Sequence, residues 1–181
     1  MNIGVISMRY AKAMLAFALE NGEENAIYNM MLQLRHTFQK VKQLPVVLQN
    51  PSLSQKERVG LICDAVNASP LFERFARLVV KEEREELFLF IAHAYIMLYR
   101  KEKKILAVDF TTAVPADDAL NGKITAMLAG DHDSVELNNV VDPSIIGGFI
   151  LEADSKRLDA SVGSQLREIR KQLVKQNRKL V

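Results

Sequence analysis

The sequence predicts a mainly α protein, with an N-terminal six-helix bundle over residues 1–103 and a small α+β C-terminal domain over residues 104–181. Up to about residue 103, apolar residues recur at the three-to-four-residue spacing of amphipathic helices. Beyond that point the spacing changes to the two-residue alternation of strands. Residues 142–173 then combine a turn, a glycine pair, a hairpin and a long helix. These observations place the expected boundary near Lys103 and Lys104.

Six helices are expected in the first domain, and most carry a start or stop signal. The first covers about residues 4–20 and ends at Asn21-Gly22, because glycine readily terminates a helix. Pro45 is expected to close the second helix, and a short helical turn follows it. The fourth helix begins with a capping box, Ser54 to Glu57, and Ser69-Pro70 opens the fifth. The expected core positions of the second, fourth and sixth helices are Ile27, Met30, Met31, Leu34, Phe38, Val41, Val59, Ile62, Cys63, Val66, Leu87, Ile91, Ala94 and Leu98.

The second domain is expected to begin with a strand, a helix and another strand. Alternation in residues 106–114 predicts the first strand, with Val114 as its last inward position and Pro115 as its end. A helical spacing from about Leu120 predicts a helix that terminates at Gly130. Residues 135–137 are expected to start the second strand.

The segment from Asp142 to Leu173 is the most specific part of the sequence. Asp142-Pro143 predicts a turn, because proline disfavours the helical region for the residue before it. Gly147-Gly148 indicates either a positive φ or the close approach of another group. A hairpin follows, with Phe149, Leu151 and Ala153 on one face of its first strand and a turn at residues 154–156.

A long helix is expected to close the chain. Asp159 or Ser161 can cap this helix, since both side chains accept hydrogen bonds from backbone amides. One side of the helix is apolar and is expected to fill the core of the domain while a basic side faces outward. The apolar positions are Val162, Leu166, Ile169 and Leu173.

Composition and motifs argue against catalytic, cofactor-binding and metal-binding functions. The formal net charge is only +2, and a single cysteine, Cys63, excludes an internal disulfide and a cysteine-rich zinc site. His36, His93 and His132 lack the paired spacing of metal ligands. No phosphate-binding, dinucleotide-binding or zinc-protease motif is present. The sequence therefore predicts a protein that is not an enzyme and that binds no cofactor and no metal.

Membrane contact is expected only through a partner. The longest nearly uncharged apolar run, residues 87–99, is shorter than the roughly 20 residues that span a bilayer. No secretory leader is visible at the N-terminus. These features predict a soluble chain.

The first and fifth helices carry more apolar residues than one core-facing stripe requires. A helix that is apolar nearly all round is expected to be covered nearly all round. Two explanations fit: the first helix is central in the bundle, or the two helices form a groove for an amphipathic helix. Small residues such as Ala11 and Ala13 permit close approach in either case.

The C-terminal helix carries six basic residues and one acid from Arg167 onward. A solvated face with cations near the helix C-terminus explains this charge most simply. An acidic protein partner is a second explanation, and a nucleic-acid-binding adaptor is the alternative function. The run from Lys81 to Glu86 is expected to be a solvated connection.

These features together resemble the delta subunit of bacterial rotary ATP synthase, whose mitochondrial counterpart is the oligomycin-sensitivity-conferring protein. The resemblance rests on Tyr10-Ala11-Lys12-Ala13 in an apolar first helix and on the order of parts in residues 142–173. Its motif positions in the second domain are Asp142, Pro143, Gly147, Gly148, Asp159 and Ser161.

The resemblance implies a non-catalytic stator subunit that joins the catalytic head to the peripheral stalk. It implies that the first domain grips the N-terminal helix of an alpha subunit and that the second meets b subunits, at the cytoplasmic face of the bacterial plasma membrane and without nucleic acid. The b-subunit contact would involve part of residues 147–173. The alpha-subunit groove carried over to this sequence consists of Tyr10, Ala13, Met14, Phe17, Phe72, Phe75 and Val79.

Overall fold

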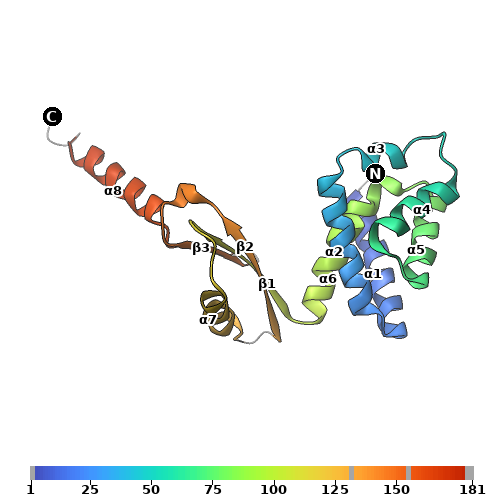
Figure 1. Ribbon diagram of the computed structural model, residues 1–181, viewed down its shortest axis with the longest axis horizontal. Coiled ribbons are helices and arrows are strands. Elements are labelled where there is room, and N and C mark those ends of the chain that lie inside the picture. Colours follow the sequence, from blue (N-terminus) through green and yellow to red (C-terminus); the bar gives the residue numbers. More distant parts are fainter. Residues whose placement is uncertain (1–2, 131–132, 154–155, 178–181) are drawn as a thin grey trace. The chain divides into compact units, whose positions relative to one another are not determined.

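The computed structural model describes residues 3–130, 133–153 and 156–177, and for residues 174–177 the course of the backbone only. The chain forms two compact units, Met1–Glu102 and Lys103–Val181. The first is helical, and the second holds a small sheet with the α-helices α7 and α8 (Figure 1).

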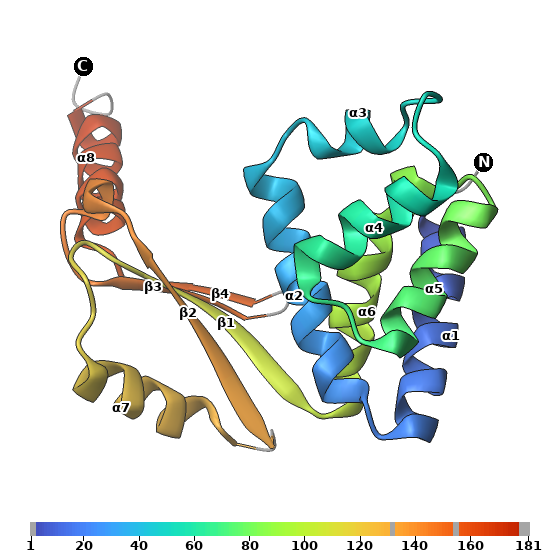
Figure 2. The same ribbon diagram turned by 45° about the vertical axis from the view of Figure 1, so that its right-hand side comes forward.

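The helical unit is organised around α6, which packs against both α1 and α2 (Figure 2). Helices α4 and α5 also pack on each other. The elements of this unit are α1 (Ile3–Asn21), α2 (Glu24–Lys40), α3 (Leu44–Leu48), α4 (Gln55–Val66), α5 (Pro70–Lys81), the 3-10 helix η1 (Glu85–Leu87) and α6 (Phe88–Glu102).

Local capping signals place the starts of α4 and α5. Ser54 Oγ accepts a hydrogen bond from the backbone N–H of Glu57, and the Glu57 carboxylate accepts one from the Ser54 N–H, so the predicted capping box is confirmed. Ser69 caps α5, and Pro70 stands in its first turn, also as predicted. The prediction for Pro45 was wrong: α2 ends at Lys40, and Pro45 lies in the first turn of α3, where its missing N–H costs no helical hydrogen bond.

Three tyrosines form a stacked row in the core between α2 and α6. The rings of Tyr28 and Tyr99 lie 4.3 Å apart, and those of Tyr95 and Tyr99 lie 6.4 Å apart. Tyr95 Oη donates to the Glu24 carbonyl at 3.2 Å, which satisfies its buried hydroxyl. Most expected core positions are buried, but Val41 is exposed because it follows the end of α2, and Met30, Cys63 and Leu98 are half-buried.

The connection from Lys81 to Glu86 is not simply solvated, contrary to the prediction. Glu85 is buried and forms an ion pair with Arg58 of α4. Arg58 also donates to the Leu53 carbonyl at 3.1 Å. A buried charge requires such partners, and this one ties the segment before α6 to the start of α4.

The second unit is a four-stranded sheet in the order β2-β1-β3-β4. Strands β1 and β2 are parallel and are joined through α7, whereas β1–β3 and β3–β4 are antiparallel. Its elements are β1 (Ile105–Thr112), α7 (Asp118–Leu128), β2 (Ser134–Val141), the 3-10 helix η2 (Pro143–Ile145), β3 (Phe149–Ala153), β4 (Lys156–Asp159) and α8 (Val162–Asn177).

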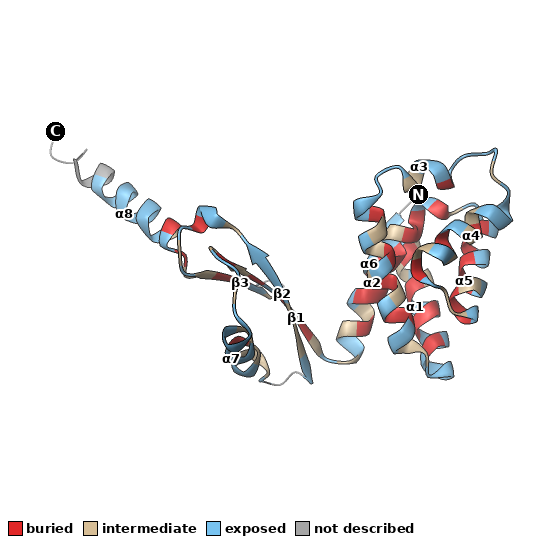
Figure 3. Ribbon diagram, viewed as in Figure 1, coloured by how far each residue is buried: buried red, intermediate tan, exposed pale blue. Residues whose placement is uncertain are grey.

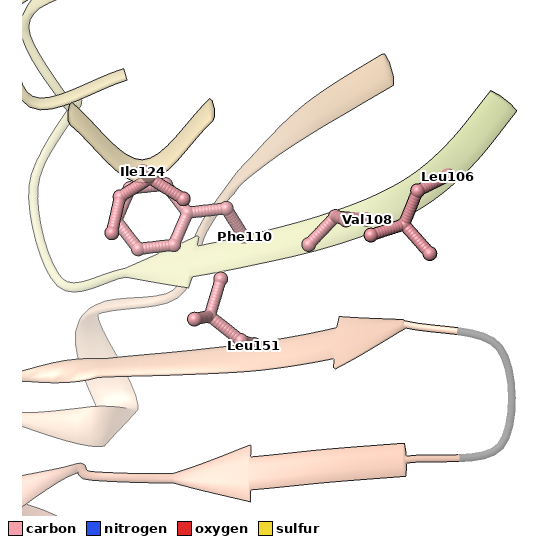
Figure 4. Close-up of a cluster of buried hydrophobic side chains, with 5 residues drawn as sticks. All are labelled: Leu106, Val108, Phe110, Ile124 and Leu151. Atoms are coloured by element: carbon pink, nitrogen blue, oxygen red, sulfur yellow. The ribbon is translucent and has the colours of Figure 1, made fainter. Parts of the chain in front are cut away.

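The core of this unit lies between the sheet and α7. Ile124 of α7 faces inward side chains of β1 and β3, as Figure 4 shows. The expectation for Val114 was wrong, because β1 ends at Thr112 and Val114 is 69% exposed. Ile150 is buried as well as Leu151, so both faces of β3 are covered at this point. The five clustered core residues are Leu106, Val108, Phe110, Ile124 and Leu151.

The motif residues of the segment 142–173 meet where η2, β3 and α8 join. Asp142 Oδ1 accepts from the Ser144 N–H at 2.9 Å, and Pro143 begins η2. Gly148 has φ +74°, and a Cβ there would lie 2.2 Å from the Ala160 carbonyl oxygen, so both expected reasons for glycine hold at this position. Gly147 instead has ordinary space beside it and accepts a backbone hydrogen bond from Val162. Asp154 and Ser155 of the expected hairpin turn lie outside the described residues.

The start of α8 uses both predicted capping residues. Ser161 Oγ accepts from the Ser164 N–H at 3.2 Å, so Ser161 is the cap. Asp159 accepts from the Ser161 N–H at 3.0 Å and from the Ser161 hydroxyl at 2.6 Å, and it also accepts from the Ser164 hydroxyl. The two residues therefore act as one capping network.

Acid is expected to weaken this cap. The hydrogen bonds from Ser161, followed by that from Ser164, lower the pKa of Asp159 to about 2 from its ordinary 3.8. A carboxylate whose pKa is depressed on folding stabilises the fold above its ordinary pKa, and this contribution is lost as the pH falls toward about 2. NMR titration of the Asp159 carboxyl should show the low pKa, and Asp159→Asn should remove the associated change in the Ser164 amide signal. A titration midpoint near 4 would contradict this expectation.

The apolar side of α8 does not fill the core, and that prediction was wrong. Beyond the first turn of the helix, every residue from Gln165 to Leu173 is exposed. The core is closed instead by α7 and the inward residues of the strands, which leaves α8 free of tertiary packing along most of its length (Figure 3).

Candidate docking site

The side chains described in residues 3–130, 133–153 and 156–173 form no metal centre. No group of three His, Cys, Asp or Glu side chains in these ranges could hold a metal ion. Burial, then the charges of Glu73 and Asp64, raise the pKa of the half-buried Cys63 thiol and so disfavour its reactive thiolate. None of the described helices is long and apolar enough to cross a membrane.

A groove of about 530 Å³ lies between α1 and α5. We call it the α1–α5 groove. Its residues from α1 are Tyr10, Ala13, Met14 and Phe17, and those from α5 are Leu71, Arg74, Phe75, Arg77, Leu78 and Lys81. Met14 and Phe75 are nearly buried, while Leu78 is 50% exposed and Phe17 is 37% exposed. The groove therefore presents apolar side chains to solvent, which normally indicates a binding surface.

An arginine lies over each of two aromatic residues of α1. Arg84 donates a hydrogen bond to Tyr10 Oη at 3.2 Å, and its guanidinium carbon is 5.7 Å from the ring centroid. The guanidinium carbon of Arg74 lies 5.8 Å from the Phe17 ring centroid. Tyr10 also packs edge-on against Phe75, with ring centroids 6.4 Å apart. These contacts hold the aromatic rings of the α1 wall in fixed positions.

The α5 side of the groove is basic. Arg74, Arg77 and Lys81 line it, and none of the described lining residues is acidic. Arg77 is paired with Glu73 on the same helix, which offsets one of the three charges. An apolar floor with a basic rim suits an amphipathic helix that carries carboxylates beside its apolar stripe.

Five of the seven residues predicted for the groove line it, and two do not. Tyr10, Ala13, Met14 and Phe17 lie on the α1 wall, and Phe75 lies on the α5 wall. Phe72 and Val79 are completely buried. They belong to the side of α5 that faces the bundle core, and helical geometry turns that side away from the groove.

Three residues of α5 that line the groove were not predicted, and each is next in sequence to a predicted one. Leu71, Arg74 and Leu78 form the edge of α5 that borders the groove, one position before Phe72, Phe75 and Val79. Their spacing of three and four residues was visible in the sequence. Which of two adjacent apolar edges of α5 faced the core was decided only by packing.

Both explanations for the many apolar residues of α1 hold: part of the helix is buried in the bundle and part of it is exposed. Ser7, Ala11, Met14, Leu15 and Ala18 are buried, whereas Val5 is 54% exposed and Leu19 is 40% exposed. Helix α1 therefore packs on α6 and also supplies one wall of a groove.

Comparison with known sequences confirms the resemblance to the ATP synthase delta subunit. A family model for the ATP synthase delta (OSCP) subunit matches residues 6–173. The chain is 44% identical over 186 residues to an ATP synthase subunit delta of Bacteroides fragilis. It is 42% identical to an ATP synthase subunit delta of Bacteroides thetaiotaomicron, and both comparisons cover all of this chain and all of the relative. It is 30% identical to the corresponding subunit of Flavobacterium johnsoniae, covering 92% of this chain and 96% of the relative.

The fold is also found in a solved structure. A chain in the cryo-EM structure of the Toxoplasma gondii mitochondrial ATP synthase hexamer superposes with a TM-score of 0.68 at 20% identity, covering 93% of this chain and 97% of that one. The similarity at this identity concerns the fold, whereas the family model and the bacterial relatives concern the sequence over nearly its whole length. The chain therefore belongs to the ATP synthase delta (OSCP) family, whose members are the stator subunits that link the catalytic head to the peripheral stalk.

Proposed function

We propose that the helical unit acts as a six-helix bundle that binds the catalytic head, by holding the N-terminal helix of an alpha subunit in the α1–α5 groove. The observation that carries the proposal is the pairing of an exposed apolar floor with a basic rim in one groove between two helices. Exposed apolar surface of this kind is retained where a partner covers it.

The groove geometry favours a helix over an extended peptide. The α1 wall offers Tyr10, then Ala13 and Met14, then Phe17 on three successive turns of one helix, so contacts repeat about every 5 Å along the groove. A helical partner repeats its side chains with the same period. Small Ala13 in the middle of this wall leaves room for a larger side chain of the partner.

We also propose that the second unit binds b subunits of the peripheral stalk through residues 147–173, and that the complete assembly lies at the cytoplasmic face of the bacterial plasma membrane. A subunit that carries no active site and binds two partners at once can transmit torque only if both attachments dissociate slowly. Within residues 147–173 several apolar side chains are exposed and could be covered by this second partner: Leu158, Val162, Leu166, Ile169 and Leu173.

Titration of the full-length chain with a synthetic peptide of the alpha subunit's N-terminus tests the head-binding proposal. We expect helix formation in the peptide, seen by circular dichroism, and an affinity that weakens with salt because of the basic rim. Arg74→Glu should reduce the affinity about tenfold, equivalent to about 1.4 kcal/mol. Lys56→Glu, the same charge reversal on α4 outside the groove, should leave it nearly unchanged. A peptide that does not bind the folded parent chain would refute the proposal.

A further inference from the structure

Strand β2 lies at an edge of the sheet, and no described strand pairs with its outer side. The strand order is β2-β1-β3-β4, so β2 is hydrogen-bonded to β1 on one side only. The register between them is one-to-one over eight residues, from Ser134 to Val141, with no bulge. A strand at a sheet edge directs backbone N–H and C=O groups outward, where they can pair with another strand.

The opposite edge of the sheet is protected against such pairing, whereas β2 is not. Strand β4 has only four residues, and Lys156, Arg157 and Asp159 among them are charged. Short and charged edge strands resist the addition of another strand. Strand β2 has eight residues, contains no proline, and carries a single charged side chain, that of Glu136. A long, regular and nearly uncharged edge is the kind to which a strand adds.

Two valines at the end of β2 are exposed, one on each face of the sheet. Val140 is 40% exposed and Val141 is 48% exposed. Because side chains alternate along a strand, Val141 shares a face with Val135 and Leu137, which pack against the core beneath α7, and Val140 lies on the other face. A strand added to the edge covers both valines, whereas a helix laid on one face covers only one of them.

The sequence of β2 is complementary to itself in an antiparallel pair. A twofold axis perpendicular to the sheet keeps both copies of α7 on one face, so only residues of the same face stand opposite each other. With Asn138 on this axis, Val135 lies opposite Val141 of the second copy. Glu136 lies opposite Val140 of the second copy, so no two like charges meet. The valine pair extends the apolar core under α7 across the edge.

Asn138 is suited to the position on the axis. Its Nδ2 donates a hydrogen bond to Asp109 Oδ1 at 2.7 Å, which holds the side chain on the face away from α7. A carboxamide has a second N–H and an acceptor oxygen. Two Asn138 side chains related by the axis can therefore donate to and accept from each other.

We propose that β2 pairs antiparallel with β2 of a second copy of this chain, which joins two four-stranded sheets into one continuous sheet. A second copy is the occupant because the same residues supply both halves of the complementary pairing. The inference concerns the free chain and is independent of the attachments proposed for the α1–α5 groove and for residues 147–173. Residues 135–141 of each copy make a small interface, so the dimer forms as the concentration rises.

Sedimentation equilibrium of the full-length chain, from about 1 to about 300 µM, tests the proposal. The average mass should rise from that of a monomer toward that of a dimer. Asn138→Lys should weaken the dimer at least about tenfold, because it places two like charges opposite each other on the axis. Its thermal unfolding should match the parent, since Asn138 is exposed and the new ammonium lies beside Asp109. Asn29→Lys, the same substitution at an exposed position of α2, should change the dimer affinity less than about twofold.

A lysine at the next position on the same face should have the opposite effect. Val140→Lys places an ammonium opposite Glu136 of the second copy, twice in each dimer. Opposite charges facing each other across strands attract, so the dimer should become about threefold tighter. General destabilisation of β2 would weaken the dimer in both variants. If Val140→Lys weakens it as much as Asn138→Lys does, the proposed pairing is wrong.

Cross-linking checks the axis directly. With Cys63→Ala as the background, Asn138→Cys should give a disulfide-linked dimer when oxidised glutathione is the oxidant, because the two cysteines face each other across the pair. Asn29→Cys in the same background should stay monomeric. Absence of the Asn138→Cys dimer under conditions where the parent chain self-associates would contradict the position of the axis.

The remaining outcomes decide whether a second copy binds at β2. A parent chain that is monomeric at every concentration refutes the proposal. A dimer that Ala13→Glu abolishes and Asn138→Lys does not would place the contact in the α1–α5 groove, and this result would overturn the proposal. A dimer that only Leu166→Asp abolishes would place it on α8 and would overturn the proposal as well.

Discussion

Gly148→Val is expected to unfold much of the second unit while the helical unit stays intact. A Cβ at this position would lie 2.2 Å from the Ala160 carbonyl oxygen, and the backbone has φ +74°, which a β-branched residue strongly disfavours. The backbone strain alone costs about 1–3 kcal/mol, and the clash with a backbone atom brings the expected total to at least about 3 kcal/mol. Small domains often have little more stability than this to lose.

Hydrogen exchange measured segment by segment would show the effect. Amides of β1, β3 and α7 should lose protection, whereas those of α1 and α6 should keep theirs. Gly122→Val is the control in the same unit, because a Cβ at Gly122 meets nothing within 4 Å and φ is not positive. That variant should change the free energy of unfolding by less than about 1 kcal/mol. Equal loss of protection in both units after Gly148→Val would mean that the units do not fold independently.

Ala13→Glu is expected to abolish binding of the alpha-subunit peptide without unfolding the chain. Ala13 is exposed in the middle of the α1 wall, so the longer side chain is tolerated in the free protein but occupies the space of the docked helix. The added carboxylate would also be desolvated on docking, which is costly for a charge without a dedicated partner. We expect a loss of at least about 100-fold, which corresponds to about 2.7 kcal/mol.

The control for this prediction lies one turn away on the same helix. Ala16 is also exposed but does not line the groove, so Ala16→Glu should leave the affinity within about threefold of the parent. Isothermal titration and thermal unfolding of both variants give the comparison. Phe75→Asp is a poorer probe, because Phe75 is only 8% exposed and its loss would disturb the core as well as the groove. If Ala13→Glu binds as tightly as the parent, the helix docks elsewhere.

Residues close in the chain were enough to predict the local elements. The capping box at Ser54 and Glu57, the cap at Ser69 and the turn at Asp142 depend on partners within three residues, and all three are present. The change from helical to alternating spacing near residue 104 likewise predicted the start of β1. For the pair Gly147-Gly148 the sequence indicated a positive φ or a close approach, and the structure shows both at Gly148.

Orientation of apolar faces could not be predicted in the same way. Helix α5 has two neighbouring apolar edges. The sequence did not distinguish Phe72 and Val79, which do not line the groove, from Leu71 and Leu78, which do. The same limit explains Glu85, whose ion pair with Arg58 joins residues far apart in the chain. A charge pattern alone does not reveal such a distant partner.

The sequence by itself determined the family, the helical and mixed halves of the chain and the local caps, because each depends on residue types at short spacing. Only the tertiary structure decided the strand order β2-β1-β3-β4, the residues of the α1–α5 groove and the exposure of the apolar side of α8. An apolar stripe in a sequence predicts that one side of a helix is covered, but it does not identify the element or partner that covers it. For Leu166 and Ile169 the sequence indicated the core, and the structure leaves them exposed because α7 already closes it.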